Sequence, residues 1–97
     1  MRIRITITES KGGGTTPETL ISERIIETES QKQLTGKRAA QILAREHPEL
    51  GLLARTAVKT SRGWMTSKST EPLRKCGYHY VWRHYYIAEA PDEPHDS

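Results

Sequence analysis

The sequence is short of cysteine, phenylalanine and long apolar runs. Its single cysteine, Cys76, excludes an internal disulfide and favours a reducing, cytoplasmic location. No apolar run approaches the roughly 20 residues of a transmembrane helix, and the alternating first residues lack the apolar core of a signal peptide. Hydrophobic residues make up only 34% of the chain. The core must therefore be thin, which suits one helix layer on one sheet face.

Acidic residues are scarce in the middle of the chain, although the net charge is only +3. Residues 32–88 carry eleven basic and three acidic side chains, whereas residues 1–31 carry four basic and five acidic ones. Residues 89–97 carry four acidic side chains and no basic one. The basic stretch has the charge expected for contact with nucleic acid or an acidic protein, and an ordinary solvated surface would have the same composition.

The first part of the chain predicts two strands. Residues 2–8 alternate polar and apolar side chains as a half-buried strand does, with Ile3, Ile5 and Ile7 facing inward. A second strand is favoured over residues 19–29, although Thr16–Glu18 could instead cap a helix.

The clearest helix is predicted over residues 31–47. Its apolar residues recur on one face at helical spacing: Leu34, Ala39, Ile42 and Leu43. Ser30 and Gln33 can form a capping box, but Gly36 weakens the first turn, so the helix can instead begin near Thr35. Pro48 ends it.

Three strands are expected after the helix, over residues 53–60, 64–69 and 76–88, with a hairpin turn at residues 61–63. The predicted fold is therefore α+β: one antiparallel sheet of about five strands with one main helix on one face. Its element order is strand, strand, helix, strand, strand, strand. Residues 1–89 form a single domain, and residues 90–97 form a disordered acidic tail.

The last strand holds all four tyrosines and one of the two tryptophans. Because side chains alternate across a strand, Val81 and Ile87 lie on one face, opposite Tyr78, Tyr80, Trp82 and His84. Either the first set packs on the helix and leaves the larger rings open, or the rings are buried and Arg83 and His79 are exposed. Exposed rings beside cations could stack unpaired bases or form a protein–protein hot spot, whereas buried rings would only fill the sheet.

Candidate binding residues follow from these patterns. Lys37 and Arg38 open the helix, where they could contact a phosphate or a carboxylate or simply be surface residues. Lys59, Arg62 and Lys68 flank the hairpin turn, where basic side chains could reach a partner or only protect a sheet edge from aggregation. The complete candidate set comprises the following residues: Lys37, Arg38, Lys59, Arg62, Lys68, Arg74, Lys75, Tyr78, Tyr80, Trp82, Arg83 and His84.

Catalytic and metal chemistry are not favoured. Cys76, His79 and His84 offer at most three metal ligands, and strand alternation points His79 away from the other two. No paired carboxylates are placed to hold Mg²⁺ for a nuclease, and a serine or cysteine nucleophile would need an orienting acid near its histidine. We therefore expect no catalytic residue, no metal site and no cofactor.

The segment from Glu27 to Leu43, followed by two strands joined by a glycine turn before Trp64, resembles small phage-encoded anti-CRISPR proteins of strand-strand-helix-strand build. The resemblance covers residues 1–70 as a pattern of elements. It implies a non-enzymatic inhibitor that docks basic side chains where a nucleoprotein complex grips nucleic acid, with Lys37 and Arg38 at the matching positions. The aromatic strand and the acidic tail have no counterpart in that pattern.

The sequence thus predicts a small non-catalytic binding protein, an accessory of a phage or mobile element. Its partner would be a host protein or nucleoprotein complex, contacted through basic and aromatic residues. A direct DNA- or RNA-binding domain is the first alternative, and a small hydrolase or nuclease is the second. An exposed edge strand could also serve a homodimer.

Overall fold

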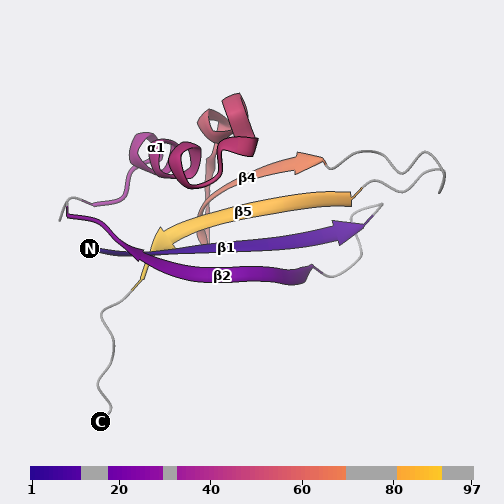
Figure 1. The fold of residues 1–97 in the computed structure, drawn as a ribbon, viewed down its shortest axis with the longest axis horizontal. Coiled ribbons are helices and arrows are strands. Elements are labelled where there is room, and N and C mark those ends of the chain that lie inside the picture. The colour runs from indigo at the N-terminus through magenta and orange to yellow at the C-terminus, as the bar shows by residue number, and fades with distance from the viewer. Residues whose placement is uncertain (12–17, 30–32, 70–80, 91–97) are drawn as a thin grey trace, which may run out of the picture.

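The computed structural model describes residues 1–11, 18–29, 33–69 and 81–90. Their strands form one five-stranded antiparallel sheet in the order β2-β1-β5-β4-β3, and the helices lie on one face of it (Figure 1). The expected α+β fold, with one antiparallel sheet and one main helix, is confirmed. None of the helices in these ranges is long and apolar enough to cross a membrane.

The two N-terminal strands are confirmed as strands. β1 (Arg2–Lys11) pairs with β2 (Thr19–Glu27) on one side and with the last strand on the other. β2 is an edge strand, almost entirely exposed, and its register against β1 shifts between Ile7 and Thr8. Such an irregularity, together with Glu23 and Arg24 at mid-strand, makes continuous pairing with another chain unfavourable.

The main helix, α1 (Gly36–Glu46), begins later than residue 31, at the alternative start that Gly36 indicated. Thr35 caps it: the backbone N–H of Arg38 donates to the Thr35 hydroxyl at 3.3 Å. The predicted capping box on Ser30 is therefore wrong as the start of the helix, since residues 33–35 precede the helix in non-helical conformation. Ser30 itself lies outside the described residues.

The predicted strand over residues 53–60 is wrong for its first half. Residues Pro48–Thr56 form a 3₁₀ segment, η1, and only β3 (Val58–Thr60) is extended. Pro48 at the first turn favours helical backbone, and Gly51, with φ +56°, bends the segment between its two turns. This bend buries Leu50 and Ala54 in the core, so packing overrides the strand-like pattern.

The hairpin joining β3 to β4 (Gly63–Ser69) is confirmed, with Thr60 opposite Gly63. β4 pairs with β5 (Val81–Glu89), which occupies the centre of the sheet between β1 and β4. The first residues of the predicted aromatic strand, 76–80, lie outside the described residues, as do residues 91–97 of the predicted tail. Ala90 is buried, and its N–H donates to the carbonyl of Arg2 at 2.8 Å.

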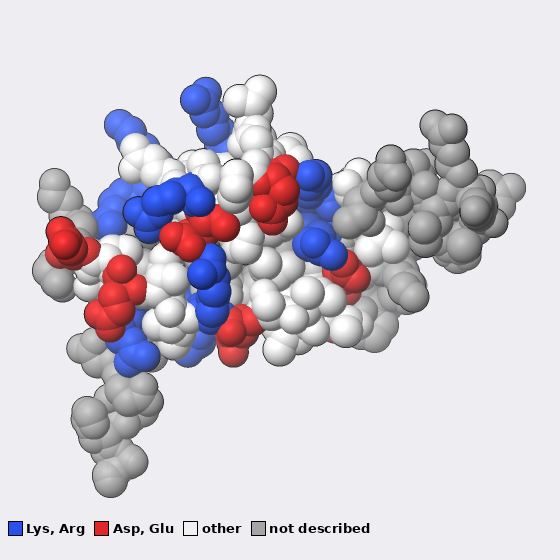
Figure 2. All heavy atoms as spheres, viewed as in Figure 1, with Lys and Arg blue, Asp and Glu red and all other residues white. Residues whose placement is uncertain are grey.

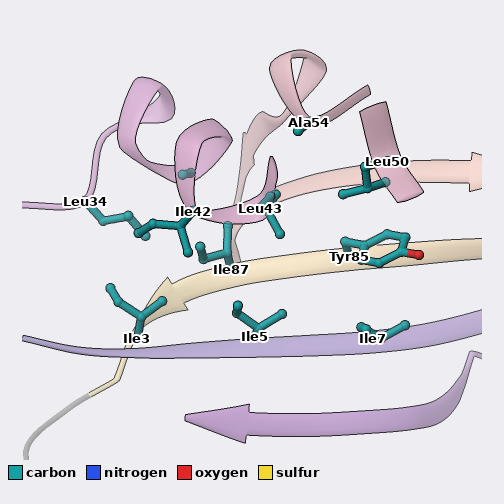
Figure 3. Packing of buried hydrophobic residues seen from close by; sticks show 11 residues of the cluster. Ile3, Ile5, Ile7, Leu34, Ile42, Leu43, Leu50, Ala54, Tyr85 and Ile87 are labelled. Atoms are coloured by element: carbon teal, nitrogen blue, oxygen red, sulfur yellow. The ribbon is translucent and has the colours of Figure 1, made fainter. Parts of the chain in front are cut away.

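The core lies between the sheet and the helices. Figure 3 shows side chains of β1 and β5 pointing toward α1 and η1, with Ile87 below Ile42 and Leu43 and with Tyr85 below Leu50. Ile3, Ile5 and Ile7 are all buried on this face, as their alternation predicts. The opposite face of the sheet carries no helix of the described chain (Figure 1).

Candidate functional site

The two faces of β5 have different roles. Tyr85 and Ile87 are at most 1% exposed against the helices, which places Trp82, His84 and Tyr86 on the other face by strand alternation. We call this other face the open face; its β1 residues are Arg4, Thr6, Thr8 and Ser10. Ile87 packs on the helix side as in the first predicted arrangement, but of the described rings on the open face Trp82 is exposed, His84 is half-buried and Tyr86 is buried.

His84 is bound within the open face. Its Nε2 lies 2.9 Å from the hydroxyl of Ser10 on β1, and its Nδ1 lies 2.7 Å from the hydroxyl of Ser67 on β4. Ser67 in turn donates to the sulfur of Met65. The imidazole thus links three neighbouring strands, which is a structural task, and it is half-buried.

Tyr86 is covered on the same face. Its hydroxyl donates to both carboxylate oxygens of Glu18, at 3.0 and 3.1 Å, and the guanidinium of Arg62 lies 4.9 Å from its ring centroid. The hydroxyl of Thr8 also donates to Glu18, at 2.6 Å. The hydrogen bond from Thr8, followed by that from Tyr86, holds the pKa of Glu18 below its ordinary value of 4.5 although burial opposes this.

A shallow hollow of about 360 Å³ lies beside Tyr86. Its lining combines two arginines with one glutamate: Arg4, Thr6, Glu23, Arg62, Tyr86 and Ala88. The Arg62 guanidinium lies 3.6 Å from Glu18 and over the tyrosine ring, while its side chain stays 62% exposed.

The open face has one arrangement that hydrolases also use: the hydroxyl of Ser10 lies within hydrogen-bond distance of His84. In catalytic triads the histidine is oriented by a carboxylate that also stabilises its charged form. Here the second imidazole nitrogen meets the neutral hydroxyl of Ser67 instead. Among the described residues, no three Cys, His, Asp or Glu side chains gather as metal ligands, and Cys76 and His79 lie outside them.

On the helix side of the sheet, two predicted binding cations are engaged internally. The guanidinium of Arg83 donates to Glu9, and hydrogen bonding to that carboxylate raises the pKa of Arg83. The ammonium of Lys68 donates to the backbone carbonyl of Glu49 at 2.8 Å. These contacts tie β5 to β1 and β4 to η1, so neither cation is fully available to a partner.

Tyr85, on the same face, contacts the side chain of Glu49 and the ring of His47; we call these three residues the polar cluster. Its hydroxyl donates to the Glu49 carboxylate at 3.1 Å, and the His47 ring stands edge-on to it at 5.2 Å. Burial, the larger effect, and the Glu49 charge raise the pKa of Tyr85. For Glu49, burial works toward a higher pKa, but hydrogen bonds from its own backbone, Tyr85 and His47 prevail and lower it. The cluster therefore fastens η1 to the sheet.

The helix layer carries a groove with a different character. It has a volume of about 600 Å³ and lies between α1 and η1. Apart from the polar Gln41, its uncharged lining residues are small or apolar: Gly36, Ala40, Ala44, Gly51, Leu52, Ala54 and Ala57. Its two charged lining residues are both cations, Lys37 from α1 and Arg55 from η1. We refer to these ten lining residues as the α1–η1 groove.

A third cation, Lys59, stands at the same end of the helix layer. Its ammonium lies 5.6 Å from the ring centroid of Trp64, which packs directly against Gly36 at the start of α1. Figure 2 shows basic side chains projecting from the border of the molecule above α1 and η1, with acidic groups lying closer to the sheet. The helix layer thus presents positive charge beside apolar surface.

The structure separates the predicted binding residues into groups. Lys37 lies on α1, Lys59 lies on the edge strand β3 over the Trp64 ring, and Arg38 is half-buried beside the helix cap. Trp82 is 40% exposed on the open face, where Arg62 and His84 also lie. Arg83 and Lys68 belong to the ion-pair and hydrogen-bond contacts of the helix side. Four predicted residues lie outside the described chain: Arg74, Lys75, Tyr78 and Tyr80.

Arg55 and Leu52 are surface residues that the sequence reasoning missed. Arg55 falls in the segment predicted as a strand, residues 53–60, and Leu52 directly precedes that segment, so neither was expected to lie beside α1. Leu52 is 75% exposed at the groove. The signal that could have found them is Pro48-x-x-Gly51, which favours two short helical turns over a strand.

Comparison of the chain with protein families, with curated proteins and with solved structures finds no match. Its function is therefore argued from its own residues.

Proposed function

We propose that this protein is a non-catalytic binding protein, a phage or mobile-element accessory that inhibits or modulates a host protein or nucleoprotein complex. The single observation that carries the proposal is the surface of the helix layer. There an exposed leucine and a groove of small side chains adjoin Lys37 and Arg55, and Lys59 lies over the Trp64 ring that packs against Gly36. Apolar surface bordered by charge of one sign is typical of a recognition site. The single cysteine favours a cytoplasmic partner.

The distribution of charge supports a partner-binding role for this surface. Two other cations of the described chain are held by nearby carboxylates: Arg24 by Glu46 at 2.6 Å and Arg83 by Glu9. Lys37 and Arg55 instead border a groove whose described lining holds no carboxylate. Cations arranged in this way attract an acidic partner and orient its approach.

A protein surface is favoured over direct contact with nucleic acid. Non-specific binding of single strands combines a basic groove with exposed rings on which bases stack. Of the aromatic side chains that the structure describes, Trp82 is the exposed one, and it lies on the open face of the sheet, away from the helix-layer cations. The described lining of the groove that holds Lys37 and Arg55 therefore supplies no ring on which bases could stack.

Affinity capture tests the proposal. The tagged protein is incubated with lysate of a bacterial host, and bound proteins are identified by mass spectrometry, with stoichiometry measured on the purified complex. We expect a stoichiometric protein or nucleoprotein partner. Recovery of no such partner would contradict the proposal, and so would steeply salt-dependent binding to bare DNA or RNA in its absence.

The enzymatic alternative has its own discriminating experiment, because Ser10 lies within hydrogen-bond reach of His84. A hydrolase or nuclease would show turnover of an ester or nucleic-acid substrate that the His84→Ala variant loses. We expect no such turnover from the wild-type protein. The Ser67 hydroxyl supplies no negative charge to stabilise a protonated imidazole.

A further inference from the structure

We propose that the α1–η1 groove docks an acidic amphipathic helix of the partner protein. This inference rests on the proposed function and names the partner's contact surface. Three features of the groove carry it: the charge of its rim, the size of its lining residues and the helical nature of both its walls.

The positive charge at the rim of the groove favours a partner surface of negative charge. Lys37 stands on the α1 wall and Arg55 on the η1 wall, so each side of the groove supplies one cation. The carboxylates of the same two elements are directed elsewhere, Glu46 to Arg24 and Glu49 to Tyr85. An occupant that carries glutamate or aspartate along both flanks would meet complementary charge on both walls.

The lining selects the shape of the partner. Gly36, Ala40 and Ala44 recur every four residues along α1, and this stripe extends about 12 Å. The small side chains of Ala40 and Ala44 leave room for larger ones from a second helix, whereas the Trp64 ring already fills the space beside Gly36. Leu52, at the η1 side, projects apolar surface that such a helix would cover. Two to three turns of an occupant fit this length.

A helix suits the groove better than an extended strand. Strand addition needs a free sheet edge that offers backbone N–H and C=O groups. Both walls here are helical, so their backbone groups are largely bonded within α1 and η1. A helix satisfies its own backbone and docks through side chains at positions i, i+3, i+4 and i+7.

The inference is tested with a designed probe and isotope-labelled full-length protein. The probe is a helical peptide of about 14 residues, with leucines along one face and glutamates on both flanks. A matched peptide carries lysines in place of the glutamates. In a nuclear magnetic resonance titration we expect the acidic peptide to shift backbone amides of α1 and η1, and the basic peptide to shift them far less.

Variants locate the contact. The double variant Lys37→Glu/Arg55→Glu should bind the acidic probe about tenfold more weakly, and Leu52→Asp should have an effect of similar size. Arg4→Glu and Leu20→Asp are matched controls, because they place the same changes at exposed positions of other elements. Glutamate at position 37 also favours the helix dipole, so lost binding would not reflect a lost helix.

The outcomes separate this inference from the proposed function. The inference is supported if the acidic peptide shifts the amide resonances of the groove residues alone and if the double variant abolishes these changes. Absence of shifts, equal shifts with the basic peptide, or groove shifts caused by a single-stranded DNA oligonucleotide would overturn it. If a captured partner binds the double variant as tightly as wild type, the inference fails while the proposed function stands. Failure to capture any partner contradicts the proposed function instead.

Discussion

Of the three described glycines Gly36, Gly51 and Gly63, Gly63 leaves the least room for a side chain. Its φ is +107°, and an added Cβ would lie 2.5 Å from the carbonyl oxygen of Ile87. The strand it begins lies directly against β5, so neither backbone can move without breaking the ladder between them. Its backbone conformation and its lack of a side chain are both required by the fold.

We predict that Gly63→Ala lowers the free energy of unfolding by about 3 kcal/mol, because backbone strain and a backbone clash add together. Gly51→Ala is the matched control: its φ is +56°, but no atom lies within 4 Å of the added Cβ. That variant should lose less, about 1–2 kcal/mol, from the strain of a sparsely populated backbone conformation alone. Urea unfolding of both variants measures the difference, and equal losses would contradict the role of the Ile87 contact.

Glu18 predicts a pH dependence of stability. Hydrogen bonds from Thr8 and Tyr86 lower its pKa in the folded state below the ordinary 4.5. Its stabilising contribution is therefore complete above about pH 4.5 and is lost as the pH falls through the lower folded-state pKa. Glu18→Gln should cost about 1 kcal/mol near pH 7 and nearly nothing at the acidic end of the titration.

The measurement is urea unfolding of wild type and Glu18→Gln across this pH range. Glu27→Gln is the control, since that carboxylate is 76% exposed and lies 4.0 Å from the nearest guanidinium nitrogen, where an ion pair contributes little. If the difference in unfolding free energy between wild type and Glu18→Gln stays constant with pH, the carboxylate charge does not stabilise the fold.

At the scale of elements, the predictable parts were those with strong periodicity. The alternation around Ile3, Ile5 and Ile7 predicted β1, and the helical spacing of Ala39, Ile42 and Leu43 predicted the buried face of α1. The segment after Pro48 was not predictable from alternation, because a bend at Gly51 and burial of Ala54 decided its conformation. Packing against α1 is a tertiary effect that local pattern does not contain.

The cap of α1 yields a prediction at this scale. Thr35→Ala removes the hydroxyl that accepts from the Arg38 N–H and should cost about 1 kcal/mol of stability. Gln41→Ala, an exposed position in the middle of the same helix, should change stability by less than about 0.5 kcal/mol. Thermal unfolding followed by circular dichroism compares the two, and a larger effect at Gln41 would contradict the assigned cap.

At the scale of the whole molecule, the sequence predicted the sheet and its single helix layer but not which surface is free. The aromatic strand attracted attention because of its composition, yet Tyr85 and Tyr86 are buried and His84 is bound between two serines. The α1–η1 groove is formed by two segments that the fold brings together. Arg55 lines it because residues Pro48–Thr56 form the helical segment η1 rather than a strand. Charge composition alone could not assign these positions.

The central claim is that the helix layer, and not the open face of the sheet, contacts the partner. Hydrogen exchange of the captured complex, compared with the free protein, tests this claim most directly. We predict that the partner slows exchange of amides within residues 36–57 and leaves those of β2 and β5 unchanged. Protection confined to β2 or to the strand that carries Trp82 and His84, with residues 36–57 unaffected, would contradict the claim.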